Sequence, residues 1–234
     1  MRLWLKFARA TELSYISHLD AHRAFSRLLR RAGLPLAYSL GFNPHPLLSL
    51  AAPLPLGFGS EADYLDVTLA RAMPLGDIAK ALCGAAGSDM LKLAGLRAVP
   101  KGKPALASLV KWAEYTIEGK AGADLLDCAI AKFLASPEVV FVKETKRGSR
   151  VVDAKGLVHR LTRTEEGLNA VLSMAEPAVL RPEELVSILT SHSEPWEIDF
   201  ISRRELYIEE LVAPLAAVLQ GLVVEGERNG CGSG

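Results

Sequence analysis

Near the start of the chain, Ser17, His18 and Asp20 are residues whose types and spacing could do chemistry. Ser17 precedes apolar residues at helical spacing and has Asp20 three positions later, a pattern typical of a helix N-cap. A helix N-terminus presents free N–H groups and partial positive charge, so it can bind an anion. We therefore expect His18 at the edge of a binding site. His18 and His45 also raise the possibility of a metal, but no third ligand is closely spaced with them.

The segment YSLGFNPHP, residues 38–46, is a second place where chemistry could occur. Its glycine and prolines predict an irregular loop, and such loops often hold binding groups on a scaffold. Tyr38 or Phe42 could stack on a base, Asn43 could read a base edge, and His45 could donate to a phosphate or act as an acid or base. The alternative is that the prolines only brace a turn while Phe42 fills the core.

The helix that starts after Ser17 has one basic face. At about 100° per residue, its four arginines fall within one arc of about 100°, opposite its apolar residues. The planar guanidinium suits bidentate binding of phosphate, so this face could grip a nucleic-acid backbone. An ordinary solvated face is the alternative. The four residues are Arg23, Arg27, Arg30 and Arg31.

A second basic cluster surrounds Gly148, where we expect the tip of a hairpin. It belongs to the basic part of the chain, because residues 1–160 hold 22 Lys and Arg against 14 Asp and Glu, whereas residues 161–234 hold 5 against 13. A flexible basic tip could bind a phosphate backbone, or it could simply be solvated. The cluster consists of Lys143, Lys146, Arg147, Arg150 and Lys155.

The sequence lacks the motifs of the commonest cofactor enzymes. It contains no P-loop, dinucleotide fingerprint, GxSxG elbow or HExxH motif. Cys83, Cys128 and Cys231 are odd in number and widely separated, which fits neither a disulfide framework nor a clustered metal site. No apolar run is long enough to span a membrane, and charges interrupt the N-terminal apolar stretch. We expect a cytoplasmic protein that has no cofactor and no membrane contact.

Hydrophobic periodicity predicts an α+β fold with a repeated order of elements. The first half reads as strand, helix, two strands, helix, strand. Strands are expected at residues 2–10, 64–69 and 91–99, and helices at 17–32 and 74–86. A proline-rich stretch lies at 44–55. The second half has strands at 112–118 and 139–144, a hairpin at 150–174 and a strand at 196–201, with helices at 123–135 and 182–191. We predict tandem ferredoxin-like βαββαβ domains with antiparallel sheets, at residues 1–104 and 105–210, and a tail at 211–234.

Several blocks of the sequence resemble the family of radical-SAM-associated proteins of unknown function. They are ISHLD (16–20), RAFSRLLRRAGLPLAYSLGFNPHP (23–46), APLPLGFGSEADYLDV (52–67), KETKRGSRVVDAKG (143–156) and RRELYIEE (203–210). The resemblance implies a radical SAM protein as partner. It also implies that the polar residues of the matching blocks form a shared site. The chain has no CxxxCxxC motif, so any radical chemistry would belong to that partner. The shared residues are Ser17, His18, Asp20, Asn43, His45, Ser60 and Glu61.

Three functions are compatible with these residues. We favour a non-catalytic module that binds RNA or presents a substrate to a radical SAM protein. One alternative is a protein-interaction subunit that does not contact nucleic acid. The other is a metal-independent RNA-processing nuclease that uses His18 or His45. The predicted binding set for the favoured function adds Arg23, Arg27, Lys146, Arg147 and Arg150 to the shared residues.

Overall fold

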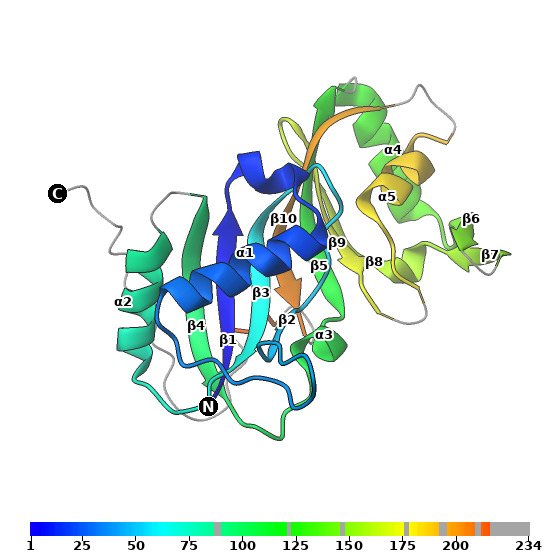
Figure 1. Cartoon of the computed structure of the whole chain (residues 1–234). Coiled ribbons are helices and arrows are strands. Elements are labelled where there is room, and N and C mark those ends of the chain that lie inside the picture. Colours follow the sequence, from blue (N-terminus) through cyan, green and yellow to red (C-terminus); the bar gives the residue numbers. More distant parts are fainter. Residues whose placement is uncertain are drawn as a thin grey trace. The chain divides into compact units, whose positions relative to one another are not determined.

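The computed structural model describes residues 1–86, 90–120, 123–145, 148–175, 178–191, 196–208 and 212–215. They form two compact units, one within residues 1–56, 60–109 and 212–215 and the other within residues 57–59 and 110–208. Each unit combines helices with antiparallel strands, which confirms the α+β prediction (Figure 1). Across the described ranges, no helix has both the length and the apolar character needed to cross a membrane.

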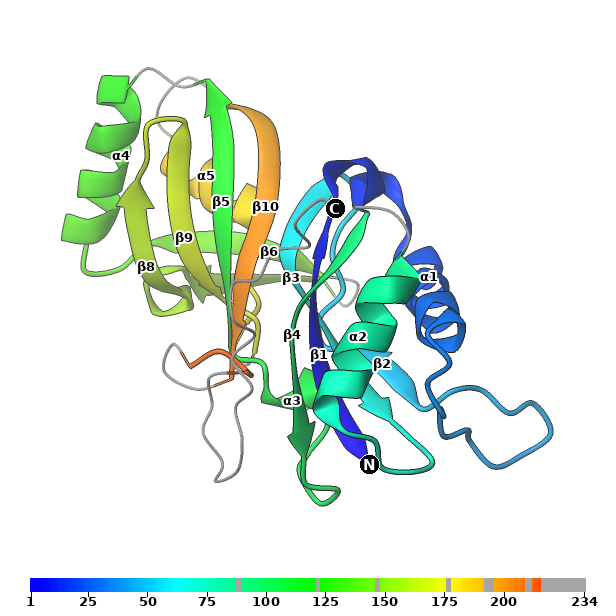
Figure 2. The same ribbon diagram turned by 90° about the vertical axis from the view of Figure 1, so that its left-hand side faces the viewer.

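The first unit follows the order strand, helix, two strands, helix, strand. Its sheet has the strand order β4-β1-β3-β2, and each neighbouring pair is antiparallel. Both long helices lie on one face of this sheet (Figures 1 and 2). The elements are β1 (Arg2–Arg9), a 3-10 helix (Thr11–Tyr15), α1 (His18–Arg31), β2 (Leu48–Leu50), β3 (Phe58–Thr68), α2 (Leu75–Ala86), β4 (Leu91–Val99) and the one-turn α3 (Leu106–Leu109).

In the core of the first unit, the strands contribute every second side chain, and α1 and α2 contribute side chains three or four residues apart that share one helix face. Leu3, Leu5 and Phe7 point from β1 to the helices and are almost fully buried. Phe7 meets Phe25 of α1 with ring centroids 5.2 Å apart. Burial of each such side chain stabilises the fold by about 1.5–3 kcal/mol. This apolar face of the sheet therefore fixes where α1 packs.

Two boundaries in the first unit differ from the prediction. β2 lies inside the proline-rich stretch, where no strand bounds were predicted, because residues 47–52 contain no proline and three of them pair with β3. β3 itself begins at Phe58 rather than at Tyr64. The alternation rule missed its first half because the buried positions there include Gly59, Ser60 and Asp63, which are not apolar.

The second unit contains a sheet with the strand order β10-β5-β9-β8 and a separate two-stranded ribbon, β6-β7. Neighbouring strands are antiparallel, and α4 contacts α5. The elements are β5 (Trp112–Lys120), α4 (Ala123–Ala135), β6 (Val140–Thr145), β7 (Gly148–Asp153), a 3-10 helix (Lys155–Leu157), β8 (Val158–Arg163), β9 (Gly167–Ser173), α5 (Pro182–Leu189) and β10 (Glu197–Tyr207).

The hairpin expected at Gly148 is confirmed, and the stretch at residues 150–174 is not one hairpin but holds the end of this first one and a second one. β6 pairs with β7, with Thr145 opposite Gly148, and β8 pairs with β9. Gly148 has φ 116°, a conformation that favours glycine and permits the chain to reverse there. β10 also continues to Tyr207, past the predicted end at Ile201, since register shifts break the apolar alternation that would have marked it.

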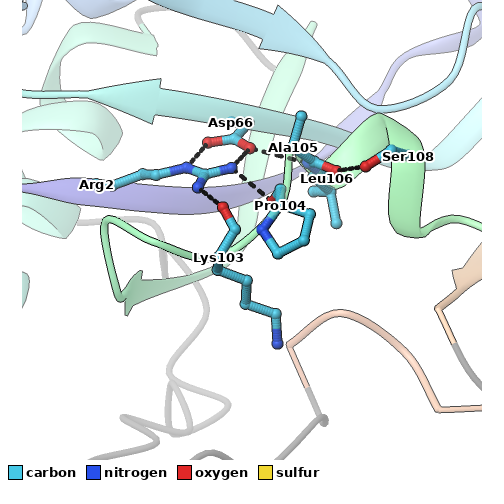
Figure 3. A network of polar contacts seen from close by, with 7 residues as sticks. All are labelled: Arg2, Asp66, Lys103, Pro104, Ala105, Leu106 and Ser108. Atoms are coloured by element: carbon cyan, nitrogen blue, oxygen red, sulfur yellow. Dashed lines mark hydrogen bonds and ion pairs between the residues drawn. The ribbon is translucent and has the colours of Figure 1, made fainter.

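Arg2 and Asp66 form an ion pair in the first unit that makes several further hydrogen bonds (Figure 3). Arg2 Nε donates to Asp66 Oδ1 at 2.7 Å and Nη2 donates to Oδ2 at 2.5 Å. The same guanidinium donates to the carbonyl oxygens of Lys103 and Pro104, and the Leu106 amide donates to Asp66 Oδ2 at 3.0 Å. The pair thus joins β1, β3 and the chain that follows β4.

We predict that Arg2→Ala destabilises the protein by about 3 kcal/mol, because it leaves the Asp66 carboxylate buried without its cation. Urea unfolding followed by circular dichroism measures this loss. Arg23→Ala is the matched control, since Arg23 also pairs with an aspartate but is 61% exposed, and it should cost far less. Equal losses in the two variants would contradict the role given to Arg2.

Candidate functional site

The N-terminus of α1 is capped as predicted. Ser17 Oγ accepts a hydrogen bond from the Asp20 amide at 3.1 Å and donates to Asp20 Oδ2 at 2.7 Å. Asp20 Oδ1 accepts from Arg23 Nη1 at 3.2 Å. The bond from Ser17, followed by the bond from Arg23, holds the pKa of Asp20 below its usual value of 3.8. The side chains of Ser17 and Asp20 therefore cap the N-terminus of the helix. His18, in the first turn, is exposed.

The basic face of α1 is also confirmed. Ala21, Phe25, Leu28 and Leu29 are buried, and the four arginines on the opposite face are exposed. Arg23 pairs with Asp20. The other three, Arg27, Arg30 and Arg31, take part in no ion pair within the described parts of the chain, so their charge is available to an anion.

The loop that follows α1 is closed at its base by a small set of hydrogen bonds. Tyr38 and Pro46 form an isolated antiparallel bridge, and the Ser39 amide donates to the His45 carbonyl at 2.9 Å. Ser39 Oγ accepts from the His45 amide at 3.1 Å and lies 2.9 Å from His45 Nδ1. His45 thus holds the two sides of the loop together, and the residues between them form a defined tip.

The tip of this loop exposes large apolar side chains. Leu40 and Phe42 are 102% and 105% exposed, and Asn43 is exposed beside them. Gly41, between the two apolar residues, has φ 134°. The alternative that Phe42 fills the core is therefore wrong. Figure 2 shows the chain between α1 and β2 extending away from the sheet.

One contact joins the loop to the basic face of α1, and a second joins α1 to β2. The Arg30 guanidinium lies 5.9 Å from the centroid of the Tyr38 ring, and His22 Nε2 lies 3.2 Å from the Leu48 carbonyl oxygen. The basic face therefore adjoins the base of the loop. We call the exposed side chains of both elements the α1–loop surface: Arg23, Arg27, Arg30, Arg31, Tyr38, Leu40, Phe42 and Asn43.

The structure divides the predicted shared site into separate groups. Ser60 is buried, and its hydroxyl donates to Asp63 Oδ1 at 3.0 Å, so it supports β3 from inside. Glu61 is exposed. Among the described residues, no hydrogen bond or ion pair joins His18 to His45, and neither ring is bonded to a carboxylate. The arrangement thus offers no assembled acid and base.

In the basic cluster of the second half, Lys143 and Lys155 already bond other groups of the protein. Lys143 Nζ forms an ion pair with Glu184 at 2.6 Å, and Lys155 Nζ donates to the Phe133 and Leu134 carbonyl oxygens, both at 3.0 Å. Arg150 is exposed. Lys146 and Arg147, which were predicted to bind, lie outside the described residues.

The second unit contains a polar group on its sheet that the sequence analysis missed. Tyr207 donates to Glu114 Oε2 at 2.5 Å, and Arg160 Nη2 donates to Glu114 Oε1 at 2.7 Å. Burial, followed by the hydrogen bond to Glu114, raises the pKa of Tyr207 to about 12. These residues lie on β10, β5 and β8, far apart in the sequence, so spacing alone had no signal for them.

A family model of uncharacterized proteins conserved in bacteria, DUF2344, matches residues 2–182. The chain belongs to this family. The family description names neither a reaction nor a partner. No curated protein matches the chain. A chain from a crystal structure of a Cbf5-Nop10-Gar1 complex is similar over 88% of this chain, with 10% identity and a TM-score of 0.42. This chain spans 50% of that chain's length, and a likeness at that level assigns no ligand.

Sequence reasoning found the arginines of this family member and left the exposure of Phe42 open, but it missed Leu40 and the contact of Arg30 with the Tyr38 ring. The available signal was a pair of large apolar residues between Ser, Gly and Asn, in a segment too irregular to bury them. No group of three or more metal-ligating side chains occurs in the part of the chain that the structure describes.

We predict that Ser17→Ala removes the cap and destabilises the protein by about 1 kcal/mol, as measured by urea unfolding. It should also raise the pKa of Asp20 toward 3.8, as measured by NMR titration of the carboxyl carbon. Because folding lowers this pKa, the ionised carboxylate stabilises the protein above pH 3.8, and this contribution is lost as the pH falls through the lowered pKa. An unchanged Asp20 titration would rule out this assignment.

We predict that the stability of the protein falls as the pH rises from about 10 to about 12, because the folded state holds the Tyr207 proton more tightly than the unfolded state. Tyr207→Phe should flatten this fall in chemical unfolding experiments. Tyr15→Phe, which alters a tyrosine that is 77% exposed, should keep the wild-type slope. A Tyr207→Phe slope equal to that of the wild type would show that another group titrates.

Proposed function

We propose that this chain is a non-catalytic RNA-binding module that uses the α1–loop surface. The observation that carries the proposal is the pair of fully exposed side chains, Leu40 and Phe42, on a loop whose base lies against Arg30. Two large apolar side chains fully exposed together at one loop tip favour a site that a ligand or partner covers. The neighbouring arginines add the charge that a polyanion requires.

The two halves of the surface suit the two parts of a nucleotide. Exposed guanidinium groups bind phosphate oxygens with bidentate geometry, and Arg27, Arg30 and Arg31 are free of ion pairs among the described residues. An exposed aromatic ring offers a stacking face to a base, which is accessible only where the strand is unpaired. Phe42 provides that face and Asn43 can bond a base edge. These features favour single-stranded RNA.

We further propose that the module presents this RNA to a radical SAM protein. The sequence blocks that resemble radical-SAM-associated proteins include α1 and the whole loop. A role in binding, with the chemistry left to a partner, fits the residues of this chain. His18 and His45 lack bonded carboxylates within the described chain and would not act as a catalytic pair. Any redox chemistry would then come from the partner, and this chain would contribute binding and orientation.

We also propose that both units are ferredoxin-like. In the first, the order of elements is βαββαβ and the strand order is β4-β1-β3-β2. The second repeats this plan with β5, β8, β9 and β10 in the order β10-β5-β9-β8, if the β6-β7 ribbon is treated as an insertion after α4. The antiparallel pairing in each sheet supports the proposal.

Binding of a fluorescein-labelled oligouridine, measured by anisotropy across a salt series, tests the proposed function. Arg27→Ala should flatten the slope of log K against log salt by about 0.7 for the lost contact. Phe42→Ala should weaken binding by about 1–3 kcal/mol without changing the slope, because stacking releases no counterions. Lys101→Ala, which removes an exposed cation outside the surface, serves as the control.

Failure of the wild-type protein to bind oligouridine or mixed-sequence RNA at low salt would overturn the RNA proposal. The same surface would then be assigned to a protein partner, which could bury the exposed side chains of Leu40 and Phe42. Equal effects of Lys101→Ala and Arg27→Ala would show that binding depends on net charge and not on the α1–loop surface.

A further inference from the structure

We propose that the open edge of β6 binds an extended peptide of a partner protein, rich in valine-like and basic residues, as an added strand. This site lies wholly within the second unit and is independent of the α1–loop surface. Three features carry the proposal: a groove, an unpaired strand edge that faces it, and an excess of acidic side chains around it.

The groove is a cavity of about 1080 Å³ formed by α4, α5 and β6. Cys128 and Phe133 line it from α4, Ile188 lines it from α5, and Val140 and Val142 line it from β6. Val140 and Val142 are 52% and 61% exposed. The groove is thus large enough for several side chains and offers them an apolar wall.

The edge of β6 faces this groove. Val140, Phe141 and Val142 are consecutive and therefore point alternately to opposite faces of the ribbon, yet all three line the same cavity. This is the arrangement expected of a strand that presents its edge to the cavity. β7 covers the other edge of β6, and no further strand pairs with the ribbon among the described residues.

The alternation of hydrogen-bonded and non-hydrogen-bonded pairs in the ribbon identifies which backbone groups of β6 do not bond β7. The Ala154 amide donates to the Val139 carbonyl at 2.8 Å, so residues 139 and 154 form a hydrogen-bonded pair. Such pairs alternate in an antiparallel ladder, so Val140, Val142 and Glu144 direct their N–H and C=O groups away from β7. No backbone group elsewhere in the described chain bonds to them, which leaves a template for another strand.

The charge of the groove selects the chemistry of the peptide. Glu138, Glu183 and Glu184 line it, and Lys132 is the single cation among the lining residues. Lys143 of β6 already pairs with Glu184 at 2.6 Å, and this ion pair ties the strand to α5. The unpaired acidic excess therefore favours lysine or arginine on the peptide, alternating with valine-like side chains that face the apolar wall.

The test uses a fluorescein-labelled hexapeptide of alternating valine and lysine, matched to the six residues of β6, and measures its anisotropy with the full chain. Val142→Pro removes one outward N–H but no bond to β7, so the ribbon can form. Val151→Pro is the matched control, because Val151 is opposite Val142 and directs its N–H to the far edge. Circular dichroism and urea unfolding confirm that both variants fold.

We expect Val142→Pro to weaken binding at least tenfold and Val151→Pro to change it less than twofold. Methylation of alternate backbone amides of the peptide should abolish binding, and Glu183→Gln should weaken it at least threefold at low salt. Absence of peptide binding, or equal effects of the two proline variants, would overturn the proposal. So would a dimer in sedimentation analysis that Val142→Pro dissociates, because a second copy would then occupy the edge. Oligouridine binding should be unchanged in Val142→Pro, which separates this test from that of the α1–loop surface.

Discussion

The ion pair between Arg2 and the buried carboxylate of Asp66 is the constraint on which the first unit depends. Two charges removed from water are costly unless they are paired and their remaining hydrogen-bond groups are satisfied. Here the carboxylate accepts three hydrogen bonds, and the guanidinium also reaches the carbonyl oxygens of Lys103 and Pro104. These requirements can be met in one register only, with Trp4 opposite Asp66. A slip of one residue would turn Leu3, Leu5 and Phe7 away from the helices.

A second ion pair holds the other end of the same two strands. Arg9 bonds Asp63 at 2.7 Å, and Ser60 donates to the same carboxylate. With β1 and β3 held at both ends, the apolar face of α1 has one position on the sheet. Its arginines then necessarily face outward, and the chain that leaves α1 must return to β2 through the loop. The ion pairs of the sheet thus help to fix the orientation of α1, and this orientation places its arginines in solvent at the candidate site.

Exposed apolar groups occur in both units and take different forms. In the first unit they are two side chains at the tip of a loop closed by Ser39 and His45. In the second they are valines on a ribbon whose edge has unpaired backbone groups. Natural proteins usually protect such edges with charge, proline or a covering element. The two features have different chemistry, one suited to a base and phosphate and the other to a peptide backbone.

The sequence by itself determined the local features: the Ser17 cap, the two faces of α1, the α+β class and most helix positions. Each depends on residues within a few positions of one another, so periodicity and capping patterns report it. Tertiary structure alone decided that Phe42 is exposed and that Ser60 is buried. It also brought Tyr207, Glu114 and Arg160 together from three strands. These outcomes depend on which segments pack against each other, and a local pattern carries no information about a partner as distant as Glu114 is from Tyr207, which is 93 residues away.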